Sequence, residues 1–217
     1  MHTRSKLALA GLAATLLMAF AVNSASANHL SVSSQNFRLV WTALTFFGEG
    51  TGSTENTIIC PVTLEGSFHS STLAKVIGAL IGHVTRATVV GTSCTGGRAT
   101  ILQETLPWHV TYEGFSGTLP RITAVRLLLR NTAFVLEANG GLGTTCLYKE
   151  NGTSAAGEVL VESGGAATAL RADERIRLPL FRSGGIGGFL CPSEGGFQGS
   201  ASVTVQGSST RITIRLI

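Results

Sequence analysis

Apolar and polar residues alternate through most of this chain, and the clearest example is the stretch from Ile58 to His69. One set of alternate positions is apolar or glycine: Ile58, Cys60, Val62, Leu64, Gly66 and Phe68. The other set is mainly polar: Ile59, Pro61, Thr63, Glu65, Ser67 and His69. A period of two places the two sets on opposite faces of a strand. The stretch is therefore predicted to be a central, half-buried β-strand.

The same alternation recurs in short segments that are separated by glycine-rich turns. Further strands are predicted over residues 37–47, 83–90, 98–106, 108–112, 122–129, 132–136, 144–148, 158–162, 169–180, 199–205 and 211–216. Residues 70–83 fit either a helical turn or a strand-loop-strand, because apolar residues recur there at helical spacing but Gly78 and Gly82 oppose a long helix. The pattern predicts an all-β fold, an antiparallel β-sandwich or barrel-like domain with at most one short helix.

The first residues have the pattern of a secretory signal peptide. Arg4 and Lys6 precede the apolar run 7–22, and Ala25-Ser26-Ala27 fits a small-residue cleavage site. A membrane anchor is the alternative, but the run is shorter than the about 20 apolar residues that a spanning helix needs. We expect residues 1–27 to be a signal peptide, 28–36 a flexible N-terminal segment and 37–217 a single all-β domain. Two smaller halves that meet near residues 138–143 are the alternative division.

The cysteines support the same compartment. The chain has four: Cys60, Cys94, Cys146 and Cys191. An even number in an exported chain predicts two disulfides. Three connectivities are possible, and we favour the sequential pairs Cys60–Cys94 and Cys146–Cys191. No CxxC or CxxH spacing is present, so a zinc site is not expected. The protein is therefore expected to be secreted or held at the cell surface, with no membrane span after cleavage.

Charge and short motifs add few functional clues. Charged residues make up only 13 % of the chain, so nucleic acid is not expected as a partner. Asp173 is the single aspartate, and no nucleophile elbow, nucleotide-binding loop or metal-ligand motif is present. His69, His83 and His109 are the candidate bases, each predicted on the polar face of its strand. No catalytic residue, cofactor or metal is predicted.

Two groups of residues are candidate binding surfaces. Trp41, Trp108 and Tyr112 could form an aromatic platform for a sugar or lipid, although large aromatic residues on strands usually belong to the core. Arg171, Arg175 and Arg177 lie on a predicted outer face and could attract an anionic polymer. The alternative for these arginines is that they protect exposed strand surfaces from aggregation.

Several short motifs together carry a family resemblance. They are Cys60-Pro61-Val62-Thr63-Leu64, Gly66-Ser67-Phe68, Cys94-Thr95-Gly96-Gly97 and Leu106-Pro107-Trp108, followed by two further cysteines. Their order resembles that of uncharacterised exported β-rich proteins of actinobacteria. More distantly, it is similar to the bacterial family called protein activator of alkane oxidation. The resemblance covers roughly residues 57–200. It implies export, a β fold and a cell-surface or hydrocarbon-related role, and it brings no catalytic residues.

These observations lead to one main functional hypothesis. The protein is expected to be an exported, non-enzymatic protein that acts at the cell surface or in the extracellular matrix by binding or assembly. Its expected partner is a cell-wall polymer, a surface glycan or another copy of itself. A carbohydrate- or lipid-binding module with an aromatic platform is the first alternative. A small secreted hydrolase built around His69 or His109 is the second.

Overall fold

The computed structural model describes residues 29–49, 56–118, 121–138, 144–150, 155–162, 165–172, 178–181 and 191–217. In these ranges the regular structure is strand, apart from two short 3-10 turns, η1 (Gly91–Ser93) and η2 (Gln103–Thr105). Every pairing between named strands is antiparallel, so the predicted all-β antiparallel fold class is confirmed. The predicted signal peptide lies outside the described residues.

The strands in this part of the chain follow one another closely. They are β1 (His29–Val32), β2 (Asn36–Glu49), β3 (Asn56–Phe68), β4 (Thr72–Ala74), β5 (Leu80–Val89), β6 (Gly97–Ile101), β7 (Trp108–Thr118), β8 (Arg121–Arg130), β9 (Ala133–Ala138), β10 (Thr145–Lys149), β11 (Ala155–Val161), β12 (Ala167–Ala172), β13 (Leu178–Phe181), β14 (Glu194–Gln198), β15 (Ser200–Val205) and β16 (Ile214–Leu216).

Eight of these strands close into a barrel. In order around the barrel they are β2, β3, β5, β7, β8, β11, β12 and β15, and β15 returns to pair with the first half of β2. The order around the barrel is also the order along the chain, so each barrel strand is the neighbour of the next one. Closure pairs every barrel strand on both sides, which leaves no free edge within this unit. Of the two predicted architectures, the barrel is the one observed.

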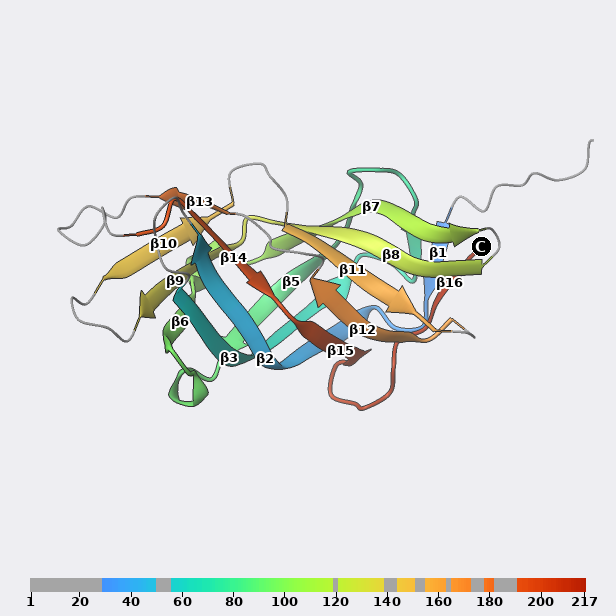
Figure 1. Cartoon of the computed structure of the whole chain (residues 1–217). Helices are drawn as coiled ribbons and strands as arrows, with labels where there is room; N and C mark the ends of the chain where they lie inside the picture. Colours follow the sequence, from blue (N-terminus) through green and yellow to red (C-terminus); the bar gives the residue numbers. More distant parts are fainter. Residues whose placement is uncertain are drawn as a thin grey trace, which may run out of the picture.

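A second set of strands extends from the far halves of β2 and β3. The strand β14 pairs with β2 from Thr45 to Glu49, and the sheet continues through β13, β10 and β9 to β6. Ile59 of β3 forms a bridge with Thr95, just before β6, so the outer strands return to β3. The long strands β2 and β3 therefore belong to both the barrel and this extension (Figure 1).

The strands β16, β1 and β4 form a separate three-stranded sheet near the C-terminal end of the chain (Figure 1). Leu30 and Val32 of β1 are 1% and 3% exposed and belong to the same core cluster as the barrel residues. The prediction that residues 28–36 form a flexible segment is therefore wrong for 29–32. Because polar residues surround Leu30 and Val32 in the sequence, the pattern did not predict this short strand, whose apolar face is buried.

Burial along the strands follows the predicted alternation. On β3, Ile58 and each alternate residue up to Phe68 are buried, whereas the residues between them are partly or fully exposed. Residues 70–83 form the strand-loop-strand alternative, with β4, a turn at Ile77–Gly78 and the start of β5. The two disulfides join Cys60 to Cys94 and Cys146 to Cys191, as the sequential pairing predicted.

Tyr148 on β10 covers two glycines of the extension. Its ring packs so closely on Gly195 that a side chain at position 195 would collide with it. Its hydroxyl oxygen lies 2.6 Å from the place that a Cβ at Gly48 would occupy. Burial raises the pKa of Tyr148 to about 12. Burial also raises the pKa of Tyr112, the only other tyrosine, and Arg126 opposes that shift.

The raised pKa values predict how the protein responds to alkali. Both phenols are held neutral in the fold, so their contribution to stability is complete below pH about 10. For Tyr148 that contribution is lost as the pH rises through about 12. We therefore expect less tyrosinate absorbance in the native protein at pH 10 than in the urea-unfolded chain, which is half ionised there, and Tyr148 should remain neutral in the fold at that pH. Equal tyrosinate absorbance of the folded and unfolded protein at pH 10 would contradict this.

Candidate functional site

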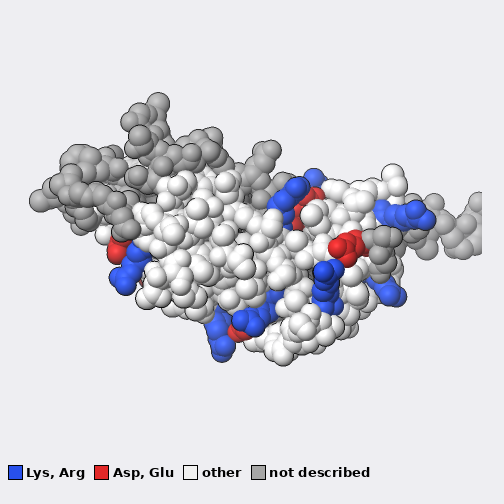
Figure 2. Space-filling model, turned by 60° about the horizontal axis from the view of Figure 1, so that its bottom comes forward, with Lys and Arg blue, Asp and Glu red and all other residues white. Residues whose placement is uncertain are grey.

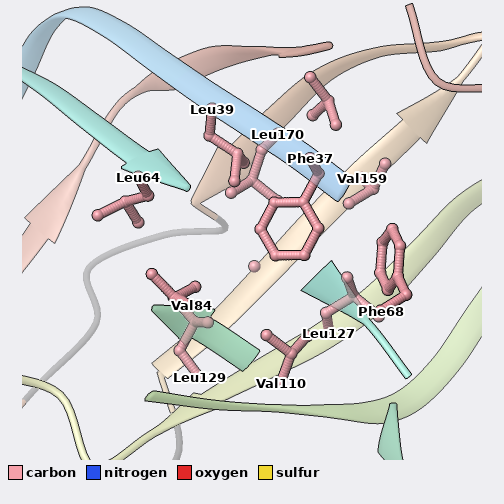
Figure 3. Close-up of a pocket in the computed structure, with 12 residues that line it drawn as sticks. Phe37, Leu39, Leu64, Phe68, Val84, Val110, Leu127, Leu129, Val159 and Leu170 are labelled. Carbon is pink, nitrogen blue, oxygen red and sulfur yellow. The ribbon is translucent and has the colours of Figure 1, made fainter. Parts of the chain in front are cut away.

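An apolar cavity of about 50 Å³ lies inside the barrel, and all the barrel strands contribute to its wall. Its lining consists of inward-facing residues: Phe37, Leu39, Leu64, Phe68, Val84, Val110, Leu127, Leu129, Gly157, Val159, Leu170 and Val203. Figure 3 shows these side chains converging on one space from strands that are far apart in the sequence. The cavity is partly open to the outside rather than sealed.

The sequence explains why space remains at this position. Inward-facing residues normally fill the interior of an eight-stranded barrel, but two inward positions on β3 and β11 are glycine. The space beside Gly66 is already filled, because a Cβ there would lie 2.7 Å from Cζ of Phe37 and would collide with the carbonyl oxygen of His83. The space beside Gly157 is not filled, because the atom nearest to a Cβ there would be Cδ1 of Leu170 at 3.4 Å. The missing side chain at Gly157 therefore contributes directly to the cavity.

The chemistry of the wall is uniform. No polar surface lines the cavity. A buried water needs two to four polar partners, so water gains little by entering such a space. A sugar would lose its hydrogen bonds there without replacement. The wall fits a hydrocarbon group and excludes polar ligands.

The predicted aromatic platform is not formed, and this prediction is wrong. Trp41, Trp108 and Tyr112 are 1%, 4% and 3% exposed, because each occupies a core-facing position of its strand. The indole N–H of Trp108 donates to the hydroxyl oxygen of Thr105 over 2.9 Å. The indole N–H of Trp41 is buried and has no hydrogen-bond partner among the described residues. These aromatic side chains are packing residues, which was the alternative interpretation.

The arginines do not form a continuous basic surface on the described strands. Arg171 is exposed, and its guanidinium lies 3.4 Å from the carboxylate of Glu158 on β11. Arg38 and Arg86 both lie beside Glu65, at 3.6 Å and 3.0 Å. Figure 2 shows the basic residues of one face as separate points, several of them next to an acidic residue. Arg175 and Arg177 lie outside the described residues.

The three candidate histidines form a cluster on the outside of the barrel. Nε2 of His69 lies 3.0 Å from Nδ1 of His83, and the rings of His83 and His109 are 5.1 Å apart between centroids. His83 and His109 are direct partners in the pairing of β5 with β7. The pKa of His83 is lowered, first by burial and then by the neighbouring His69 and His109.

The surroundings of these histidines do not support the predicted hydrolase. A histidine that activates a hydroxyl must lie within hydrogen-bond distance of it. Among the described residues, no carboxylate or hydroxyl is hydrogen-bonded to any of the three imidazoles, and the one hydrogen bond of the cluster joins His69 to His83. The sequence placed all three on polar strand faces, but it did not show that they are neighbours.

Comparison of the chain with protein-family models, with curated proteins and with solved structures gives no match. The family resemblance of the sequence therefore stays a prediction. Within the described ranges, no helix is long and apolar enough to cross a membrane.

Proposed function

We propose that this protein is an exported, non-enzymatic binding protein whose ligand is a straight hydrocarbon chain held in the barrel lumen. The observation that carries the proposal is the cavity itself, which has wall residues from every barrel strand and no polar surface. The two disulfides support a place outside the cytoplasm, since such bonds form and persist in oxidising compartments. The lining residues include no titratable group, which supports binding rather than catalysis.

The volume of the cavity sets the shape of the ligand. At about 50 Å³ it is a third of the about 150 Å³ apolar cavity, known from an engineered protein, that binds benzene. A ring does not fit this space, but the end of a straight chain does. Each buried CH₂ group is worth about 0.8 kcal/mol, or about a fourfold gain in affinity. Affinity should therefore rise with chain length until the chain fills the lumen.

A series of straight-chain alcohols from butanol to dodecanol tests the proposal. We expect binding, measured by calorimetry and by the shift in melting temperature, to strengthen by about fourfold for each added CH₂ over the first members. Adamantanol, which carries a similar amount of carbon in a rigid cage, should not bind. If no alcohol binds, or if adamantanol binds as well as decanol, the lumen is not a chain-binding site.

Gly157→Val should separate ligand binding from folding. The new side chain projects into the cavity, so we expect alcohol binding to fall by at least tenfold while the fold is kept. Gly157→Ala should be more stable than the native protein by about 0.5–1 kcal/mol, because glycine weakens a strand by that amount. The matched control is Gly114→Ala on β7, where the three atoms nearest to a Cβ all belong to the flexible Arg126 side chain, the first of them Nη2 at 2.9 Å. Unchanged binding in Gly157→Val would contradict the proposed site.

A further inference from the structure

A second site is suggested by the histidine cluster, which lies outside the lumen and is independent of it. Nε2 of His69 and Nδ1 of His83 are joined by a hydrogen bond over 3.0 Å, so one of them carries the shared proton. A metal bound by both nitrogens would replace that proton, with each ring keeping its own proton on the other nitrogen, and a neutral imidazole nitrogen is a common metal ligand. His69 directly follows β3, and His83 lies on its neighbour β5, where it is paired with Ser67. Two adjacent strands of a closed barrel therefore hold the pair in place.

We propose that His69 and His83 form a two-histidine binding site for Cu²⁺, with water in the remaining coordination positions. Metal–nitrogen distances are about 2.0–2.1 Å, so two ligands 3.0 Å apart enclose an angle of about 95° at the metal. That angle fits the adjacent positions of a square-planar or tetragonal site and is narrower than a tetrahedral one. Square-planar or tetragonal nitrogen and oxygen ligands are typical of Cu²⁺ and Ni²⁺, and Cu²⁺ binds most tightly among the divalent first-row metals.

The rest of the cluster supports a site with two protein ligands rather than three. No group of three or more His, Cys, Asp or Glu side chains in the described ranges is placed around a common metal position. His109 packs edge-on against the ring of His83, with ring planes at 75°, so it limits how His83 can rotate. We assign His109 a positioning role. On the other side of His109, Arg130 on β8 is its strand partner, and the carboxylate of Glu150 lies 4.0 Å from that guanidinium.

The local backbone also fixes His69. Its amide donates to the carbonyl oxygen of Ile81, and its carbonyl oxygen accepts from the Gln35 side chain over 3.2 Å. The imidazole itself is exposed, while His83 is half-buried. The pair is thus anchored through its backbone and open to solvent on one side, as a site with bound water requires.

The test is a Cu²⁺ titration of untagged protein in which His2 and His29 are both replaced by alanine. The chain has 5 histidines, so this background leaves only the three of the cluster. It also removes His29. If the leader is cut after Ala27, His29 becomes the second residue of the chain and would bind copper together with the free amino group. We expect one Cu²⁺ per chain and an electron paramagnetic resonance spectrum with coupling to two imidazole nitrogens. Absence of binding, or coupling to one nitrogen or none, would overturn the proposal.

Single variants in this background assign the ligands. His69→Gln and His83→Gln should each weaken Cu²⁺ binding by at least tenfold, since even residues that only orient metal ligands contribute about 10–100-fold. His109→Gln should keep two-nitrogen coupling and alter its magnitude. Gln can still form hydrogen bonds, and His69 is exposed, so His69→Gln should fold normally, which a thermal melt checks. Binding within tenfold of the background in both His69→Gln and His83→Gln would show that copper binds elsewhere.

Discussion

Replacing Cys60 and Cys94 together by alanine is expected to lower the free energy of unfolding by about 4 kcal/mol. The disulfide closes a loop with a sequence separation of 34 residues, and the chain-entropy model gives about that value for such a loop. A whole domain is typically stable by only about 5–15 kcal/mol, so the loss is a large fraction of the total. Urea denaturation of the oxidised native protein and of the double variant measures the difference.

The position of this disulfide predicts which part of the molecule loosens. Cys60 is fully buried on β3, next to Ile59, whose bridge with Thr95 returns the outer strands to β3. Without the disulfide, amide hydrogen exchange should increase first in β6 and β9, while the barrel strands β7 and β8 keep their protection. The matched control is the double alanine variant of Cys146 and Cys191. The Cys146–Cys191 disulfide closes a loop with a similar sequence separation of 45 residues, so its removal should cost a similar amount of stability. In this variant, however, amide exchange should increase around β10 and β14. A loss below about 1 kcal/mol in both variants would contradict the expectation.

Alternation was enough to predict the fold class because one face of nearly every strand is buried. On β3 each inward residue between Ile58 and Phe68 was identified correctly from the sequence alone. The strands that were missed lack that signal. The strand β14 contains two consecutive glycines, Gly195 and Gly196, and the Tyr148 ring covers Gly195. The strand β4, for which the sequence left a helical turn and a strand open, has one buried residue, Leu73. The alternation of apolar and polar residues within a segment cannot predict a strand whose position depends mainly on pairing and packing with neighbouring strands.

Closure of the barrel is also invisible to local pattern. It depends on β15 pairing with β2, as in the match of Val203 with Leu39, across most of the length of the chain. The candidate sites depend on the same long-range register. The alternation placed Leu64 and Phe68 on the apolar face of β3, but only closure brings them into the wall of a lumen with residues of the other barrel strands. Likewise, His83 and His109 become neighbours only because β5 and β7 pair, since the turns η1 and η2 and the strand β6 separate them in the sequence.

Phe37→Ala is the second substitution with a large expected effect, and it joins the stability of the barrel to its proposed function. Phe37 is 4% exposed and packs against Phe68 with ring centroids 4.9 Å apart. It also fills the space over Gly66. Removing a buried phenyl group costs about 3–5 kcal/mol, because transfer energy is lost and a void remains. We expect a loss in this range in urea denaturation, with a folded protein still present at room temperature.

The void left by Phe37→Ala adjoins the existing cavity, so the two spaces should act as one. The enlarged lumen approaches the about 150 Å³ that holds benzene in an apolar cavity. We therefore expect benzene to raise the melting temperature of Phe37→Ala, but not of the native protein, and to compete with octanol. Phe46→Ala is the matched control, because Phe46 is as deeply buried but packs against Phe134 and Phe197, outside the cavity wall. It should lose a similar amount of stability and bind octanol as the native protein does. If benzene raises the melting temperature of the native protein as much as that of Phe37→Ala, or does not displace octanol from Phe37→Ala, the chain-binding site does not lie in the lumen.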